Sequence, residues 1–510
     1  MSMFASVVKA MPRRSRRIFL LPLLVIGTVL LSLTYFYDPG SWSAVAERFP
    51  LGLSITTTGN RTPPSSTTTT GLVDEEEEVL VVDPDYPPSY RALKKQIQDL
   101  PQHNLDLPFP EGRNGRYVKF SSEIQLLGWN NVLNERLMDT YLAYKSNRAY
   151  VFADYIWKED YYPWPKEKAI EWPPITPLPA LISGPSVGGS WGPNDPAPRS
   201  ISEKWYEVVC PPERRRIINT HEVKPALVNE TGSVVFATWQ KILLDAPESC
   251  IEIQPASREE DSYPQVFDLW VWGSWKVLSL WDVFSKSPVS QLLGVSPTIE
   301  RLVESNKAIF MEPKNTATGE EVVTVDPFSR MLAIHLRRGD FKQACLSLSN
   351  WNSTFYSWNL LDFLPDKFTP PPGGGWGTNT PENEALYMKH CLPSDEEILQ
   401  KIRDSRTEYL KAVEEQGRKE TLDVLFLLTN DKSGWLDEVK KIMMADGWKV
   451  VATSHDLVLD REGKDVAMAL DMELARKASV FIGNGWSSFT SNIVHRRLVD
   501  GRIPMSNRFY

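Results

Sequence analysis

Residues 333–340 read AIHLRRGD, an apolar run that ends abruptly in a histidine, two arginines, a glycine and an aspartate. The apolar run predicts a strand, and in open α/β sheets ligands bind beyond the carboxyl ends of the strands. A guanidinium donates paired hydrogen bonds that match phosphate oxygens, and it keeps its charge at physiological pH. Arg337 and Arg338 are therefore candidate phosphate ligands. The alternative is a surface strand end whose arginines pair with Asp340 and other carboxylates.

The second half of the chain alternates between predicted strands and predicted helices. We expect strands at 331–336, 424–429, 449–452 and 480–483, and helices at 395–416, 437–445, 464–477 and 487–499. This alternation predicts an α/β fold with a parallel sheet and helices on both of its faces. An insertion between Cys345 and Cys391 contains PPPGGG at 370–375, and a loop of that length inside a compact domain is usually functional or disordered.

The first half begins in the same way. Residues 117–120 alternate like a short strand, apolar residues between 133 and 144 repeat at helical spacing, and 149–153 resembles a second strand. The stretch GWNN at 128–131 lies at the junction of the first strand and the helix. Residues 156–212 are dense in Pro, Trp and Gly, which predicts long irregular loops. A further helix is expected at 292–307, and the boundary between the two halves near 313–326.

Two more strand ends carry polar residues that suit a nucleotide. GNGWSSFT at 483–490 combines glycines that permit a tight turn, hydroxyls that donate to oxygens, and a helix N-terminus with free N–H groups. Taken alone, this segment is a helix capped by Ser487. LLTNDKS at 427–433 supplies Asp431, which either accepts hydrogen bonds from a base or ribose or caps the next helix. Three polar strand ends on one rim of a parallel sheet together predict a nucleotide-diphosphate site.

The composition indicates an acidic globular protein, so any site that binds an anion must be confined to a small region of the fold. The 510 residues leave room for two or three domains, and 42% hydrophobic residues with 18 Trp indicate a large buried core. The formal net charge of -9 argues against a nucleic-acid binder, because such proteins normally present a basic face.

The N-terminus has the composition of a membrane anchor. Basic residues at 13–17 precede 18–37, which contain no charged residue, and about 20 apolar residues are what a bilayer core requires of a helix. The positive-inside rule places the N-terminus in the cytosol and the rest in the lumen of the Golgi or endoplasmic reticulum. We therefore expect a cytosolic tail at 1–17, a type II signal anchor at 18–37 and a disordered Ser/Thr/Pro-rich and acidic stem at 38–112. A cleaved signal peptide, with AVA at 44–46 near its cleavage site, is the alternative.

Three sequence patterns fit N-glycosylation, which is meaningful only for a lumenal chain. They begin at Asn60, Asn229 and Asn352. Because chance supplies several such patterns in a chain of this length, they add little to the argument for a lumenal topology.

The four cysteines are compatible with two disulfides in an oxidising compartment. Their order along the chain suggests that Cys210 pairs with Cys250 and Cys345 with Cys391. The sequence itself allows three connectivities. Buried free thiols are a further alternative.

Several enzyme classes are disfavoured by missing motifs. The chain has no phosphate loop with Gly-Lys-Ser/Thr and no Gly-x-Ser-x-Gly nucleophile turn. DPD at 83–85 lies in the expected stem, and His221-Glu222 lacks the second histidine of a zinc peptidase. Kinases, serine hydrolases and zinc peptidases are therefore disfavoured, and we expect no metal site.

Three of these segments resemble one protein family. HLRRGD at 335–340 looks like the first motif of the GDP-fucose-dependent fucosyltransferase superfamily, and FIGNGWSSFT at 481–490 resembles the last motif of its protein O-fucosyltransferase branch. GWNN at 128–131 resembles the N-terminal Gly-x-x-Gly-Asn-Gln element of that branch, with departures that leave the acceptor open. The matches span about 116–499 in the family's order, so the chain resembles a divergent, fungal-type member.

The resemblance implies a GT-B architecture, in which two Rossmann-like halves, 113–320 and 321–510, face each other across a cleft. It implies inverting, metal-independent transfer of fucose from GDP-fucose to a protein or glycan hydroxyl, with no cofactor beyond this donor. Arg337, at the β-phosphate, and Asn131, near the transferred sugar, are the implied catalytic residues. The implied substrate-binding residues are His335, Arg337, Arg338, Asp340, Asp431, Ser487, Ser488, Phe489, Thr490, Gly128 and Asn130.

The sequence leaves the general base and the acceptor open. Glu135 and Asp340 are candidate bases, but either is alternatively a structural partner, and we expect Asp340 to orient the neighbouring arginines. We expect the acceptor pocket to come from the Trp-Pro-rich loops and the insertion between Cys345 and Cys391. Two other functions remain open: a membrane-anchored protein that binds nucleotide sugar or glycan without transfer, and a transferase of the same fold that uses another nucleotide sugar.

Overall fold

The structure, a computed structural model, describes residues 85–312, 326–338, 341–373, 375 and 379–510. The expected tail at 1–17, the expected anchor at 18–37 and Asn60 lie outside these residues. No helix within the described ranges has the length and apolar character needed to cross a bilayer.

The first half contains a five-stranded parallel sheet with the order β6-β2-β1-β8-β7. Its strands are β1 (Tyr117–Phe120), β2 (Ala149–Phe152), β6 (Ile201–Ser202), β7 (Arg215–Asn219) and β8 (Cys250–Gln254). Its main helices are α5 (Trp129–Lys145), α7 (Glu203–Val209) and α8 (Gly232–Asp245). The expected start of strand, helix and parallel strand is confirmed as β1, α5 and β2.

The second half contains another five-stranded parallel sheet, with the order β12-β11-β10-β13-β14. Its strands are β10 (Met331–Leu336), β11 (Val424–Thr429), β12 (Val450–Thr453), β13 (Val480–Gly483) and β14 (Asn507–Phe509). Its helices include α15 (Asp395–Glu414), α16 (Trp435–Ala445), α17 (Arg461–Lys477) and α18 (Ser488–Val499). The predicted alternation is confirmed, while β14 was not foreseen.

The central strand β10 is covered on both faces. Met331 and Ala333 pack into one hydrophobic cluster, whereas Leu332, Ile334 and Leu336 pack into another on the opposite face. Side chains of a strand alternate between its two faces, so a strand with helices on both sides needs an uninterrupted apolar run. The run MLAI at 331–334 has this pattern.

Shorter elements of the described residues precede, connect or interrupt the two sheets. The remaining helices are α4 (Arg91–Gln98), α6 (Leu178–Leu181), α9 (Leu269–Trp272), α10 (Trp281–Phe284), α11 (Pro288–Gln291), α12 (Pro297–Asn306), α13 (Phe341–Asn350) and α14 (Pro381–Cys391). Two antiparallel pairs join β3 (Tyr155–Ile156) to β4 (Ile175–Thr176) and β5 (Ile182–Ser183) to β9 (Gly294–Val295). The helix expected at 292–307 begins only at Pro297, because Ser296 caps it by accepting a hydrogen bond from the Ile299 N–H.

The stem boundary predicted at residue 112 is wrong. Helix α4 lies within the predicted stem, and the buried Tyr90 hydroxyl donates to Asp465 in α17 at 2.9 Å. Arg461 donates to the main-chain oxygens of Tyr86 and Pro87. The low-complexity composition ends before these residues, and a tyrosine that supplies both apolar area and a hydroxyl anchors the segment to the fold.

Both disulfides suggested by the order of the cysteines are present. Cys210 is bonded to Cys250 and Cys345 to Cys391. The second disulfide joins α13 to the end of α14, so the insertion begins and ends as helix rather than being one long loop.

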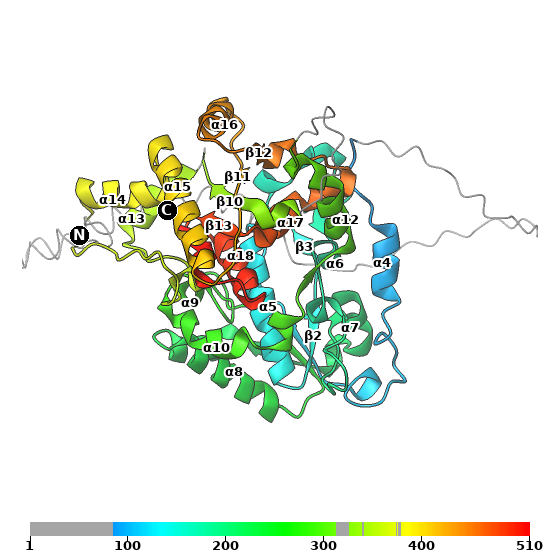
Figure 1. The fold of residues 1–510 in the computed structure, drawn as a ribbon. Helices are drawn as coiled ribbons and strands as arrows, with labels where there is room; N and C mark the ends of the chain where they lie inside the picture. Colours follow the sequence, from blue (N-terminus) through cyan, green and yellow to red (C-terminus); the bar gives the residue numbers. More distant parts are fainter. Residues whose placement is uncertain (1–84, 313–325, 339–340, 374, 376–378) are drawn as a thin grey trace, which may run out of the picture. The chain divides into compact units, whose positions relative to one another are not determined.

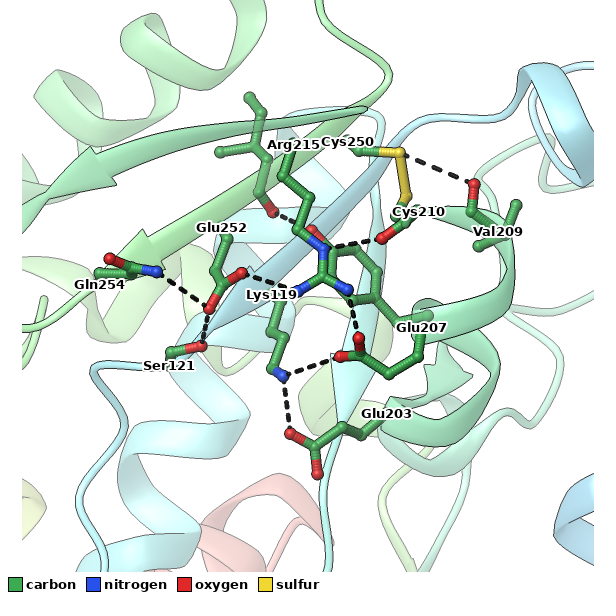
Figure 2. Close-up of polar contacts among 12 residues, drawn as sticks. Lys119, Ser121, Glu203, Glu207, Val209, Cys210, Arg215, Cys250, Glu252 and Gln254 are labelled. Atoms are coloured by element: carbon green, nitrogen blue, oxygen red, sulfur yellow. Dashed lines mark hydrogen bonds and ion pairs between the residues drawn. A yellow bond between two sulfur atoms is a disulfide. The ribbon is translucent and has the colours of Figure 1, made fainter. Parts of the chain in front are cut away.

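An ionic cluster beside the first disulfide ties α7 to the sheet (Figure 2). Arg215 in β7 donates to the Cys210 carbonyl at 2.7 Å, to Glu252 in β8 at 3.1 Å and to Glu207 in α7. Lys119 in β1 lies 2.8 Å from Glu203 in α7. Although burial opposes it, hydrogen bonds from Ser121 and charges such as that of Lys119 lower the pKa of Glu252. The cluster therefore holds the edge strand β7 and α7 against the sheet.

Helix α5 carries buried carboxyl groups. Glu135 and Asp139 on α5 lie near Glu123 in the preceding loop, and the charge of Arg136, whose Nε lies 3.5 Å from Glu123, acts on Glu123 and Glu135. Burial raises the pKa of Glu123 to about 7 and that of Glu135 and Asp139 well above their usual range. Neither carboxyl oxygen of Asp139 has a hydrogen-bond partner.

We expect Asp139→Asn to stabilise the protein at neutral pH. The folded state holds protons on these carboxyl groups that the unfolded state releases, so the free energy of unfolding falls as pH rises from about 4 to 7. An amide removes this penalty. Chemical denaturation should show a gain in the free energy of unfolding at pH 7.5 that disappears near pH 4. The exposed Asp404→Asn is the control, and a gain independent of pH would contradict the interpretation.

Candidate active site

Three strand ends meet at one edge of the second sheet. Strand β10 lies between β11 and β13, with Leu336 opposite Thr429 and Ile334 opposite Ile482. Because all three strands are parallel, the segments that follow them leave the sheet on the same side. The sequence-based expectation of one shared rim is confirmed.

His335 links the end of β10 to the first turn of α18. Its Nδ1 lies 3.4 Å from Oγ1 of Thr490, and its ring centre lies 4.7 Å from that of Phe489. Burial, helped by the charge of Arg337, lowers the pKa of His335 to about 3. The imidazole is therefore neutral at physiological pH, so it can accept or donate a hydrogen bond without adding charge.

The loop between β13 and α18 approaches its neighbours closely. A Cβ on Gly483 would lie 2.2 Å from Thr490, and one on Gly485 would lie 2.3 Å from the Phe355 ring. Ser487 caps α18, since its Oγ accepts from the Thr490 N–H at 3.5 Å. The interpretation of Ser487 as a helix cap is therefore confirmed. The first main-chain N–H groups of α18 follow in the same turn, at the edge of the sheet.

The insertion between Cys345 and Cys391 supports this loop. Tyr356 donates its main-chain N–H to the Gly485 carbonyl at 2.8 Å, and the Asn359 amide donates to the same carbonyl at 2.9 Å. Asn484 donates to the Cys391 carbonyl at 2.9 Å. The disulfide-linked insertion therefore fixes the main chain in front of α18, a role that the sequence analysis missed because the contacts are distant in sequence.

The two arginines of the first motif have different surroundings. The Arg337 guanidinium lies 5.6 Å from the centre of the Phe341 ring. Arg338 donates to the Pro393 carbonyl at 2.6 Å and lies 4.5 Å from the centre of the Trp435 ring. Arg338 also lies 4.0 Å from the Asp395 carboxylate, so it has the kind of partner that the alternative interpretation requires. Asp340 lies outside the described residues.

A cavity of about 820 Å³ lies beside Arg338. Its lining comes from α14, from the starts of α15 and α16 and from the segments after β10 and β11, and includes Arg338, Lys389, Asp395, Glu396, Asp431 and Trp435. Asp431 also stabilises the turn before α16, since its Oδ1 accepts from the Ser433 N–H at 2.8 Å and from the Ser433 hydroxyl at 2.6 Å. Asp431 therefore meets both interpretations of the sequence: it stabilises a turn and it lines a cavity.

Helix α5 of the first half packs against α18 near the site (Figure 1). Gly128 precedes α5, and the buried Asn130 accepts two hydrogen bonds from the Asn492 amide, at 2.9 and 3.0 Å. These contacts give Asn130 a structural role between the two helices. Next to it, Asn131 accepts from the Tyr356 hydroxyl at 3.4 Å, so Tyr356 contacts both α5 and the loop before α18.

Glu135 has the surroundings of a structural group. It is 2% exposed, and its Oε2 accepts from the Ile124 N–H at 2.6 Å. A general base must reach the acceptor hydroxyl directly or through one water. The structural alternative for Glu135 is therefore the better one.

Comparisons with known proteins find similarity in structure only. No family model and no curated protein matches the chain. A crystal structure of POFUT1 in complex with GDP-fucose (crystal-form-I) is 14% identical, covers 78% of this chain and 97% of that chain, and gives a TM-score of 0.41. A crystal structure of NodZ alpha-1,6-fucosyltransferase soaked with GDP-fucose is 10% identical, covers 75% and 92%, and gives a TM-score of 0.31. At this level of similarity the function must be inferred from the residues of this chain.

We expect Gly485→Ala to destabilise the protein by about 1–3 kcal/mol, because the added methyl group collides with Phe355. That ring is 2% exposed and packs against Trp486, Phe368 and Phe509, so it has little room to move. Gly434→Ala is the matched control, since nothing lies within 4 Å of its Cβ position. Urea denaturation of both variants measures the difference, and equal stability would contradict the close packing of this loop.

Proposed function

We propose that this chain is a glycosyltransferase that transfers fucose from GDP-fucose to a hydroxyl of a protein or glycan. The main support is that the segments 335–338 and 487–490, which carry the two family-like motifs, come together through the contacts of His335 with Thr490 and Phe489. Segments 155 residues apart in sequence thus form one rim with a cationic side chain and a helix N-terminus.

The chemistry of such a transfer fits this arrangement. Breaking the bond between sugar and phosphate leaves negative charge on the diphosphate while positive character grows on the sugar. We propose that the Arg337 guanidinium and the first N–H groups of α18 at Ser488 and Phe489 stabilise the leaving diphosphate. In this proposal the transfer needs no metal ion and inverts the sugar configuration, with Asn131 near the transferred sugar.

The cavity beside Arg338 suits the nucleobase. Guanine presents N–H donors on its N1 and N2 edge, which match carboxylate acceptors such as Asp431 and Asp395. Arg338 and Trp435 offer flat surfaces in the same cavity. We therefore propose that the guanosine end of the donor binds here, with its diphosphate directed toward α18.

The proposed location is the lumen of the Golgi or endoplasmic reticulum, with residues 18–37 as the anchor. Two disulfides among the described residues support an oxidising compartment. The candidate base Glu135 is buried, and this favours a second candidate function, a protein that binds the nucleotide sugar without transferring it. Both functions require binding of the nucleotide sugar, but only the transferase releases GDP and a fucosylated product.

We expect Arg337→Ala to lower the rate of fucose transfer by about 100-fold or more, because it removes a charged donor to the leaving group. Isotope-labelled GDP-fucose with a lumenal extract as acceptor measures transfer and hydrolysis together. Arg216→Ala in β7, where Arg216 pairs with Glu248, is the control. A variant as active as the parent would contradict the proposed role. A parent that gains thermal stability with GDP-fucose but shows neither transfer nor hydrolysis would favour the binding protein.

A further inference from the structure

A group of exposed aromatic and apolar side chains lies on the surface of the first half. Val228, Tyr263, Trp270 and Trp275 are 67%, 37%, 58% and 59% exposed, and we call them the aromatic patch. Contacts of their segments link them in sequence: the Tyr263 and Trp270 rings are 5.9 Å apart, and Ser274, next to Trp275, donates to the Trp270 carbonyl at 2.7 Å. Lys276, also next to Trp275, donates to the Val228 carbonyl at 2.6 Å. Single exposed apolar side chains are ordinary, but a grouped set indicates a surface that something covers.

One of the three glycosylation patterns begins at the edge of this patch. Asn229 follows Val228 directly and is exposed. Thr231, the third residue of the pattern, caps α8 by accepting a hydrogen bond from the Val234 N–H at 3.4 Å. The acceptor amide therefore lies in a surface turn before a helix, where a bulky polar modification meets no buried group.

Asn352 has the opposite surroundings. Its backbone is left-handed, with φ of 49°, and its Oδ1 accepts a hydrogen bond from the buried Tyr387 hydroxyl at 3.3 Å. Tyr387 packs against Phe368 and Trp486, next to the loop that precedes α18. The amide of Asn352 is therefore half-buried and held against this aromatic cluster, which leaves less room for a glycan on its nitrogen than at Asn229.

We propose that Asn229 carries an N-linked glycan whose first sugars cover the aromatic patch, and that Asn352 is not modified. The inference rests on the lumenal location given under the proposed function. In the modification, the Asn229 amide nitrogen attacks the anomeric carbon of a lipid-diphosphate-linked oligosaccharide. The new N–C bond replaces the C–O bond to the diphosphate, which leaves with its electron pair, and the amide loses one proton. The apolar C–H faces of the sugars then pack on the indole rings.

Mass spectrometry of the full-length protein from a eukaryotic host tests the assignment. Enzymatic removal of N-glycans in ¹⁸O water converts each modified asparagine to a labelled aspartate. We expect the label at Asn229 and none at Asn352. Modification of Asn352, or a modified Asn60 beside an unmodified Asn229, would overturn the inference while leaving the lumenal location intact. Absence of label at all three asparagines would overturn the inference, whereas loss of fucose transfer alone would affect only the proposed function.

A second measurement tests whether the glycan covers the patch. We expect Asn229→Gln to increase the binding of a hydrophobic fluorescent dye several-fold and to leave the rate of fucose transfer unchanged. Trp270→Ser with Trp275→Ser should abolish this increase in the same background. Asn60→Gln, which removes a pattern in the predicted stem, is the matched control. Equal dye binding by the parent and Asn229→Gln would overturn the covering role.

Discussion

The approach of the β10 end to the first turn of α18 is the constraint on which the rest of the site depends. His335 contacts Thr490 and Phe489, and Gly483 allows Thr490 to come within a distance that any side chain at 483 would block. The parallel register of β10 and β13 sets this approach, because it brings both strand ends to the same edge. The segment that carries Arg337 and the N-terminus of α18 thereby lie at the same edge of the sheet, and a guanidinium and a helix N-terminus both favour an anion.

Residues that are distant in sequence from this rim hold it in place. The insertion reaches back through Tyr356 and Asn359 to fix the Gly485 carbonyl, and Asn492 joins α18 to α5 through Asn130. The first half thus contacts α18 through buried amide hydrogen bonds, which are costly to leave unpaired. Tyr356 contacts the loop through its main-chain N–H and Asn131 through its hydroxyl, so one residue links the proposed donor and sugar positions.

The sequence predicted the helices and strands whose apolar residues repeat at a regular spacing, and it missed the features that depend on contacts between residues distant in sequence. The strands at 331–336, 424–429 and 480–483 match β10, β11 and β13 at both ends, because apolar runs between polar strand ends leave little ambiguity. The short strand β14 pairs with β13 through main-chain bonds that carry no sequence pattern. The structural partners of Arg338 and Asn130 were equally invisible, since Pro393 and Asn492 are distant in sequence.

The central claim is that Arg337 and the start of α18 hold one diphosphate between them. A crystal structure of the protein with bound GDP tests it most directly. We expect diphosphate oxygens within hydrogen-bond distance of both the Arg337 guanidinium and an N–H group at Ser488 or Phe489. GDP bound at another place, or with its diphosphate directed away from α18, would contradict it.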